Sequence, residues 1–472
     1  MNKTKNYLYN IIYRISICVL PLVVTPYITR VLGIENNGLY AFSSSIACYF
    51  IMFAKLGIEN YGNRTIASCI SGQRARNKLF WSIYAMQLLT GFISMSIYIL
   101  LVVTVFRDNL MLYAIQGIYV LSSFFDVSWF FFGIEDFRYT AYRSVAARVM
   151  IIVGVFAFVR DSNDLNMYTL VMSAAFLIEQ LLLIPKLIKT VSWEKVGWED
   201  IAVHFKPNLA LFLPLLALSI FNWMDKLMIG LLSNNKEVAY YNYGDSIINL
   251  PKGIITAIGT VMLPRVAGMA ARGDLINYKK ELKSSSKLVC MICCALGFGI
   301  AGIAPVFVPF FLGPGYEPTV DITVWLAAVM VPLCFIDIIQ TQYLIPFNKE
   351  KDYTMSLVLG ALVNLVLNII FIPRYASLGA VAGTLGAEIT VFIYQLISAR
   401  KVYGVRDVLN SILPFVPCGI LEFTVVRYIA GMSFSVLIIL ILQVLAGGAM
   451  YLICCVPVYY KEIKVYINRK NS

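Results

Sequence analysis

The chain alternates long apolar stretches with short polar loops over nearly its whole length. Each stretch is close to twenty residues long, the length that an α-helix needs to cross a bilayer. Fourteen such spans are predicted, near residues 9–29, 40–56, 79–105, 110–132, 141–159, 166–188, 208–232, 243–264, 287–312, 320–346, 353–372, 377–399, 411–430 and 433–459. Because the number is even, both termini are expected on the same side of the membrane.

The first apolar stretch differs from a simple membrane anchor. It contains Arg14 and is interrupted by Pro21 and Pro26, and a short polar loop separates it from the second stretch. Buried arginine and helix-breaking proline are tolerated in lipid only beside protein or water. We therefore expect this helix to line a cavity, with Arg14 on the inside.

The composition excludes a soluble domain. Hydrophobic residues make up 60% of the 472 residues and charged residues 14%, whereas about 25% of the residues of soluble domains are charged. The predicted fold class is an all-α polytopic membrane protein.

The basic residues of the loops predict the orientation, because lysine and arginine are retained on the cytoplasmic side. The even-numbered loops and the two tails hold 27 of them, Arg143 included, and the odd-numbered loops hold 6. Both termini are thus expected in the cytoplasm. This topogenic bias explains most of the net charge of +12, so no nucleic-acid partner is predicted.

Two parts of the chain match at an offset of 201 residues, which indicates an internal repeat. Residues 38–46 align with residues 239–247, and Arg64 aligns with Arg265. The repeat predicts two six-helix bundles of the same orientation, related by a pseudo-two-fold axis along the membrane normal. The predicted divisions are an N-terminal bundle (1–190), a cytoplasmic linker (191–206), a C-terminal bundle (207–402), and two additional helices with a cytoplasmic tail (403–472).

No cofactor, metal site or catalytic constellation is predicted. His204 is the only histidine, and nearly all of the ten cysteines fall inside apolar segments, where cysteine acts as a small packing residue. The chain has no nucleophile beside a histidine and no glycine-rich phosphate loop. Neither an enzyme nor an ATP-driven pump is expected.

Six basic residues fall at membrane depth: Arg14, Arg30, Lys55, Arg148, Lys226 and Lys252. An unpaired cation at the midplane costs at least about 2.5 kcal/mol, so each needs a reason. Snorkelling to the interface or a ligand role stays open for Arg30, Lys55 and Lys226. A structural ion pair or a ligand role stays open for the other three.

Polar residues in the second half suggest two further sites. Asp245, Asn249 and Lys252 are spaced four and three residues apart, so they share one helix face. We expect this stripe to face the cavity. Asp337, followed closely by two glutamines, is the candidate ion-coupling residue.

A cavity with more fixed cations than anions favours an anionic substrate, because opposite charges attract strongly in a low dielectric. Aromatic residues of the fourth and eighth segments, such as Trp129, Phe130 and Tyr241, suit stacking on sugar rings, although they also suit contact with lipid. The predicted substrate-binding residues are Arg14, Arg30, Lys55, Arg148, Lys226, Asp245, Asn249 and Lys252.

Several motifs resemble those of bacterial polysaccharide-biosynthesis flippases. They are PYITRVLG at 26–33 with GLY at 38–40, LGIENYGNR at 56–64, WFFFGIE at 129–135, DKLMIG at 225–230 and the stretch 304–313. The resemblance runs from the first to the twelfth helix. The same motifs mark a wider superfamily that includes multidrug and toxic compound extrusion transporters and lipid II flippases.

The resemblance implies two six-helix bundles in a V shape around a central cavity, and an oligosaccharide on undecaprenyl pyrophosphate as substrate. The substrate would cross the bacterial cytoplasmic (inner) membrane for O-antigen or capsule assembly. Membrane lipids, H⁺ or Na⁺, and a polysaccharide polymerase are the implied partners. Family members carry cavity cations on helices such as one, two, seven and eight, where Arg14, Arg30, Lys55, Lys226 and Lys252 fall.

Other functions stay open. A cation-coupled multidrug exporter should have an acid-rich cavity, and a lipid II flippase belongs to the same superfamily. A membrane scaffold or a glycan polymerase is a different class, but a polymerase usually needs a large external loop and the outer loops here are short.

Overall fold

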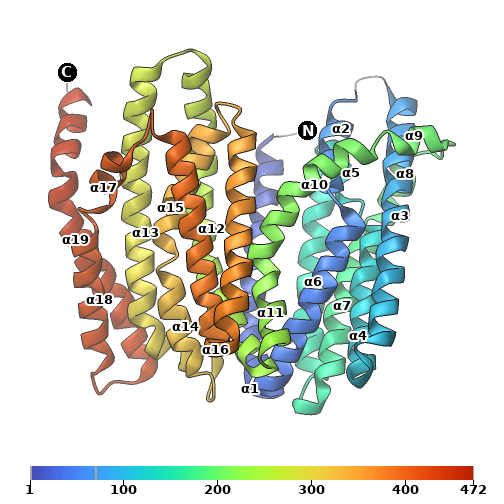
Figure 1. The fold of residues 1–472 in the computed structure, drawn as a ribbon, viewed down its shortest axis with the longest axis horizontal. Helices are drawn as coiled ribbons and strands as arrows, with labels where there is room; N and C mark the ends of the chain where they lie inside the picture. Colours follow the sequence, from blue (N-terminus) through green and yellow to red (C-terminus); the bar gives the residue numbers. More distant parts are fainter. Residues whose placement is uncertain (1–2, 70–71, 471–472) are drawn as a thin grey trace. The chain divides into compact units, whose positions relative to one another are not determined.

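The computed structural model describes the backbone of residues 3–69 and 72–470, and the side chains of residues 20–459 except 70–71, 221–222, 250, 254, 257 and 260–261. The described residues form helices joined by short loops, without a strand (Figure 1). The all-α prediction is confirmed. The chain divides into two compact units, residues 1–230 and 231–472.

The predicted spans have helical counterparts. Within the described part of the chain, 11 helical segments are long and apolar enough to cross a membrane. Two of them, Leu20–Ala67 and Glu350–Ala399, contain a break at Gly33 and Ala376 and therefore hold two predicted spans each. Helix α12 contains the predicted span 243–264. The 11 segments, two of which hold two spans each, together with α12 account for all fourteen predicted spans.

The described part of the first unit contains ten α-helices and most of an eleventh, α11, which ends in the second unit. They are α1 (Lys3–Lys55), α2 (Ile58–Ala67), α3 (Gln73–Thr104), α4 (Leu110–Ser122), α5 (Ser128–Gly133), α6 (Phe137–Phe158), α7 (Leu165–Leu181), α8 (Ile184–Thr190), α9 (Trp198–Ala202), α10 (Phe205–Ser219) and α11 (Asp225–Leu232).

A single residue turns the chain between the first two predicted spans. Gly33 has φ 74° and ψ 175°, whereas the residues on either side of it are helical. Asn37 Nδ2 donates to the carbonyls of Ile28, at 3.1 Å, and Gly33, at 2.6 Å. These bonds satisfy acceptors that the break frees, so the predicted polar loop is replaced by a tight helical turn.

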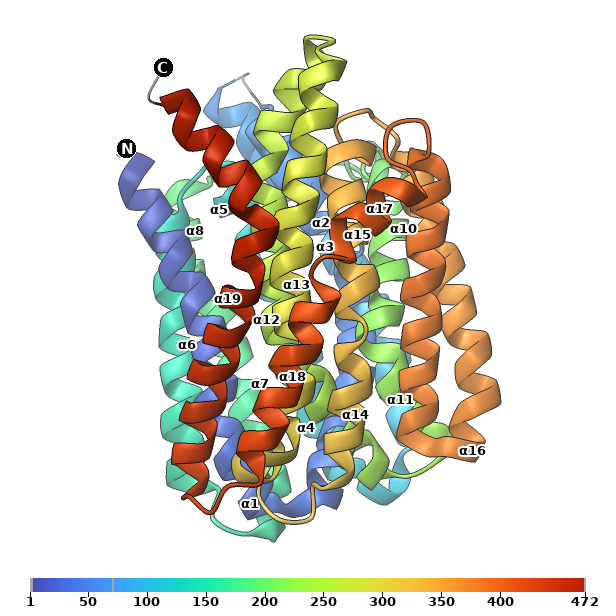
Figure 2. The same ribbon diagram turned by 90° about the vertical axis from the view of Figure 1, so that its left-hand side faces the viewer.

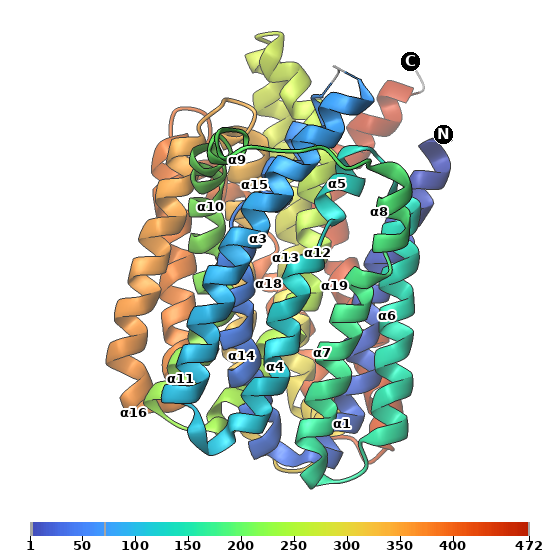
Figure 3. The same cartoon turned by 90° about the vertical axis from the view of Figure 1, so that its right-hand side faces the viewer.

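The seventh predicted span, 208–232, lies in the first unit up to Gly230, where that unit ends. His204 explains how α10 is attached. Its Nδ1 lies 2.7 Å from Tyr61 Oη on α2, and its Nε2 lies 2.8 Å from Ser82 Oγ on α3. The predicted linker runs across the end of α3, where Trp81 Nε1 donates to the carbonyl of Ser192 (Figure 3).

The second unit begins within α11 and holds the remaining helices. They are α12 (Asn235–Ala271), α13 (Leu275–Leu312), α14 (Pro318–Ala327), α15 (Met330–Ile339), α16 (Glu350–Ala399), α17 (Val405–Ile412), α18 (Val416–Ala430) and α19 (Val436–Lys470). A π-helical turn, η5 (Gln340–Leu344), follows α15 directly. The predicted additional pair of helices corresponds to α18 and α19, which pack against α13 (Figure 2).

Helix α16 breaks at Ala376, which has φ 48° and ψ −125°. Positive φ is costly for a residue with a Cβ atom. The following turn is held from α12, because Glu237 accepts hydrogen bonds from the backbone N–H and the hydroxyl of Ser377. Glu237 thus satisfies a donor at the start of the new helix.

The aromatic residues considered for sugar stacking are mostly packing residues. Trp129, Phe130 and Phe131 are fully buried in a core of the first unit built around Phe80. In the second unit, Tyr241 is buried and its hydroxyl bonds to that of Thr384. A side chain enclosed in this way contacts neither lipid nor a sugar ring.

The orientation of the chain remains a prediction, and the structure suggests where to test it. In the first unit, α2, α8 and α9 lie at one end, opposite the bend within α1 (Figure 1). The loops at that end are rich in lysine and arginine. Reporter fusions at Ser472 and near Lys279 should read cytoplasmic, and a fusion near Glu317 should read external. An external C-terminus would reverse the assignment.

Candidate functional site

The fourth predicted span is interrupted in the middle of the first unit. Helix α4 passes through a 3₁₀ turn, η2 (Ser123–Phe125), to an extended residue, Asp126, and α5 starts two residues later. Asp126 Oδ1 accepts a hydrogen bond from the backbone N–H of Ser128 at 3.0 Å and another from its hydroxyl. The predicted span 110–132 is confirmed as an apolar helical segment, Arg107–Gly133, but it contains a local break that hydropathy does not register.

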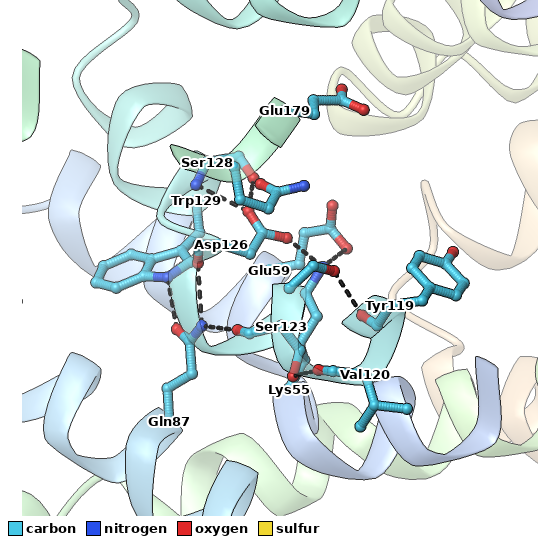
Figure 4. A network of polar contacts seen from close by, with 12 residues as sticks. Lys55, Glu59, Gln87, Tyr119, Val120, Ser123, Asp126, Ser128, Trp129 and Glu179 are labelled. Atoms are coloured by element: carbon cyan, nitrogen blue, oxygen red, sulfur yellow. Dashed lines mark hydrogen bonds and ion pairs between the residues drawn. The ribbon is translucent and has the colours of Figure 1, made fainter. Parts of the chain in front are cut away.

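Gln87 of α3 satisfies the backbone at this break (Figure 4). Its Nε2 donates to the carbonyls of Ser123, at 2.7 Å, and Asp126, at 3.0 Å, and its Oε1 accepts from Trp129 Nε1 at 3.0 Å. These bonds use both functions of the Gln87 amide. Non-helical backbone at membrane depth needs such internal partners, because lipid supplies none.

Lys55 is bound to the broken helix. Its Nζ lies 2.6 Å from Asp126 Oδ2 and 3.7 Å from Glu59 Oε2 (Figure 4). The side chains of Lys55 and Asp126 are 18% and 10% exposed, whereas Glu59 is 58% exposed. Lys55 therefore points into the unit toward a buried acid, and the end of α1 is tied to the α4–α5 break.

Arg143 was assigned to a cytoplasmic loop from the sequence, and the structure corrects this. Arg143 lies on α6 and is 8% exposed. Its Nη1 donates to Gln180 Oε1 at 2.5 Å and to the carbonyl of Glu179 at 3.4 Å. Its charge also acts on both Asp126 and Lys55. The acid and amide at positions 179 and 180 were the available sequence signal, but their pairing depends on how α6 packs against α7.

Arg148 lies further along α6 and has a looser partner. Its Nη1 is 4.0 Å from Glu179 Oε2, and its guanidinium lies 5.4 Å from the centroid of the Phe176 ring. The side chains of Arg148 and Glu179 are 15% and 8% exposed. This ion pair is at the limit of direct contact, unlike that of Lys55.

These residues form one group, which we call the N-terminal charge cluster: Lys55, Asp126, Glu179, Arg143 and Arg148. It contains three cations and two buried acids. The Nε atoms of Arg143 and Arg148 are buried and have no hydrogen-bond partner among the described residues. Buried donors are nearly always satisfied in proteins, so the cluster has unused capacity for an anionic acceptor.

The other predicted binding residues of the first unit lie elsewhere or are not described. The side chain of Arg14 lies outside the described residues. Arg30 is exposed next to the turn at Gly33 and donates to the carbonyl of Pro26 at 2.5 Å. Lys226 is half-buried on α11, and its charge acts on Cys48 of α1.

The predicted polar stripe of the second unit lies on α12. Asp245 and Lys252 are half-buried and Asn249 is exposed. The charge of Lys252 acts on Glu388 of α16, which identifies an acidic neighbour for this lysine. The sequence did not single out this pair, because positions 252 and 388 are brought together by the packing of α12 against α16.

Asp337, the predicted ion-coupling residue, is enclosed in the second unit. It is 7% exposed on α15, and its Oδ2 has no hydrogen-bond partner among the described residues. A Cβ atom on Gly259 of α12 would lie 2.3 Å from this oxygen, so the α12 backbone approaches it closely. The π-helical turn η5 begins three residues later, and such turns are frequent at functional positions.

Comparison with known proteins identifies the family to which this chain belongs. Residues 4–270 match the family model described as "Polysaccharide biosynthesis protein". The chain belongs to this family. A curated relative, a "Putative O-antigen transporter" of Escherichia coli (strain K12), is 22% identical over 84% of this chain and 96% of its own length.

Two solved structures share the fold of this family member. A "Lipid II flippase MurJ" in an inward closed conformation is 18% identical, covers 97% of this chain and 100% of its own, and has a TM-score of 0.78. An inward-facing multidrug resistance MATE family transporter is 14% identical, with 87% and 96% covered and a TM-score of 0.60. The chain is therefore a multi-pass membrane protein with a transporter fold.

Proposed function

We propose that this protein is a flippase for lipid-linked oligosaccharides. It would move a repeat unit on undecaprenyl pyrophosphate across the bacterial inner membrane by alternating access, for O-antigen or capsular polysaccharide assembly. The family and the O-antigen transporter relative support the saccharide part of this proposal. The N-terminal charge cluster supports the anionic carrier.

The observation that carries the proposal is the pair of unsatisfied arginine donors in the cluster. Arg143 and Arg148 each have a buried Nε–H that finds no acceptor in the part of the chain that the structure describes, whereas Lys55 pairs closely with Asp126. Guanidinium groups bind phosphate oxygens through paired, charge-assisted hydrogen bonds. A pyrophosphate supplies both the negative charge and the acceptors that these two side chains lack.

Alternating access would explain how a substrate reaches these donors. Both Nε atoms are enclosed in the described conformation. A second conformation with α6 and α7 further apart would open them to the membrane or to water. Substrate charge would then favour the open state, because a ligand shifts a conformational equilibrium by its differential affinity for the two states.

The direct test is deletion of the gene, followed by analysis of the lipid-linked oligosaccharide in each leaflet. Loss of a flippase should cause the oligosaccharide to accumulate on the cytoplasmic side while surface polysaccharide disappears. Normal distribution in the deletion strain would reject the proposal. Accumulation of lipid II instead would favour the second candidate, a lipid II flippase, which the MurJ-like fold supports.

A multidrug exporter is less well supported. The N-terminal charge cluster would not suit a cationic drug, because each of its buried acids already has a basic neighbour. Drug resistance that falls on deletion, with unchanged surface polysaccharide, would favour export.

Energy coupling through Asp337 forms a separate part of the proposal. The chain has no nucleotide motif, and a membrane potential supplies about 2.3 kcal/mol per charge per 100 mV. We expect Asp337→Asn to reduce surface polysaccharide strongly at normal protein level, because the amide can neither gain nor release a proton and binds Na⁺ weakly. Thr341→Val is the control, since it leaves the carboxyl in place and removes only the hydroxyl that donates to the main-chain carbonyl of Asp337. Transport that resists both ionophores and Asp337→Asn would remove this assignment.

A further inference from the structure

Glu422 is a buried carboxyl in the helices that follow the predicted repeat. It lies on α18, which packs against both α13 and α19 (Figure 2). Glu422 is 6% exposed, and its Oε2 has no hydrogen-bond partner among the described residues. An ionised carboxylate without a counter-charge is strongly disfavoured in such a place.

Glycine residues on two neighbouring helices make room for this side chain. A Cβ atom on Gly299 of α13 would lie 2.9 Å from Glu422 Oε1, and one on Gly447 of α19 would lie 3.7 Å from its Cγ. The carboxyl is therefore held at the meeting point of three helices. It is not directed to a polar surface.

Arg427 is the only basic residue on α18 and on the apolar stretches 288–312 of α13 and 436–459 of α19. The other titratable groups of these stretches include Cys294 on α13, Cys418 on α18, and Tyr451 and Cys455 on α19. Tyr451 donates its hydroxyl proton to the carbonyl of Met291 at 2.6 Å. Arg427 lies over the Phe423 ring, at 5.1 Å from its centroid, and five residues along a helix turn it away from Glu422.

Gln443 carries a second acceptor oxygen, in the same helix pair, that is unpaired within the described part of the chain. It is fully buried on α19, and its Nε2 donates to the carbonyl of Val426 at 2.9 Å. Its Oε1, like Glu422 Oε2, has no partner among the described residues. The packing of α18 and α19 thus encloses two acceptor oxygens that have no hydrogen-bond partner among the described residues. One proton on Glu422 would remove the charge and provide a donor.

We propose that Glu422 is a proton-binding site that controls the packing of α18 and α19 against α13. The carboxyl is protonated while the three helices are packed, and it releases its proton to water when they separate. Two oxygens among glycine, valine and thiol neighbours are too few for Na⁺ or another hard cation, which takes about six oxygen ligands. This proposal for Glu422 does not depend on which substrate the protein transports.

The test uses the purified full-length protein and dicyclohexylcarbodiimide, an apolar reagent that modifies protonated carboxyls. Peptide mass spectrometry should find Glu422 labelled at about pH 6 and labelled much less at about pH 9, since one proton titrates tenfold per pH unit. E422Q should remove this label. Glu317 is an exposed loop carboxyl whose pKa is lowered by hydrogen bonds from its own backbone N–H and from that of Gly315; it is the control and should stay unlabelled.

Three outcomes would overturn the proposal. Absence of label at Glu422 over the whole range would mean that the carboxyl is ionised or closed to the reagent. Labelling independent of pH would identify a structural acid that never releases its proton. Protection by Na⁺ at constant pH would identify a cation site.

A stability measurement tests the linkage to packing independently. The unfolded chain releases the Glu422 proton readily, whereas the packed state keeps it. The unfolding temperature of the wild type should therefore fall relative to that of E422Q as the pH rises. E317Q should follow the wild type. Parallel curves for wild type and E422Q would contradict the proposal.

Discussion

Replacing Lys55 with alanine should destabilise the protein by about 3 to 5 kcal/mol, because it leaves the buried Asp126 without its cation. Asp126 lies 2.6 Å from Lys55 and its side chain is 10% exposed. The same carboxylate also holds the start of α5 through Ser128, so the damage should reach the α4–α5 break. Protein level in the membrane and the unfolding temperature in detergent measure the effect.

Two control variants test whether the stranded charge of Asp126 causes this loss of stability. Lys55→Met combined with Asp126→Asn removes both charges while the amide oxygen can still accept from Ser128, so most of the stability should return. Lys78→Ala breaks an exposed pair with Asp200, in which the side chains are 51% and 34% exposed, and should cost about 1 kcal/mol or less. Equal losses of stability for Lys55→Ala and Lys78→Ala would show that the burial of the Lys55–Asp126 pair does not increase the cost of breaking it.

Arg148→Ala should abolish surface polysaccharide, because it removes one of the two arginines assigned to the pyrophosphate. The single variant also leaves Glu179 buried without a cation, so its protein level should fall. Adding Glu179→Gln removes the stranded charge. The double variant should restore the protein level in the membrane and leave transport absent, and both quantities are measured in the same strain.

This design separates a ligand role from a structural one. If Arg148 only stabilises the fold, transport should return together with the protein level in the double variant. Lys252 on α12 allows a parallel test, since Lys252→Arg keeps its charge and should be tolerated better than Lys252→Glu, which places a second acid near Glu388. Normal surface polysaccharide in the Lys252→Glu strain would exclude Lys252 as a headgroup ligand.

The N-terminal charge cluster also shows that assigning basic residues to loops does not predict which of them are buried. Arg143 lies at the start of an apolar segment and was counted with the cytoplasmic loops, yet it is buried beside Gln180. Arg148 lies two residues from the middle of the same predicted segment, 141–159, so its depth alone marks it as a candidate. The depth of a residue along a helix follows from its position in one segment. Its burial depends on which neighbouring helix covers that side, and this is not visible in the segment itself.

The sequence by itself determined the membrane spans, their all-helical nature and the family, because these depend on local hydropathy and on contiguous motifs such as residues 26–33 and 56–64. It also identified Lys55, Arg148 and Asp337 as charges at membrane depth. The tertiary structure alone decided their surroundings: Asp126 beside Lys55, Glu179 beside Arg148, and for Asp337 a buried Oδ2 without a hydrogen-bond partner among the described residues. Each pair joins positions far apart in the chain. Charge pairing at a few ångströms is set by helix packing and by local breaks such as that at Asp126, and neither leaves a periodic signal in the sequence.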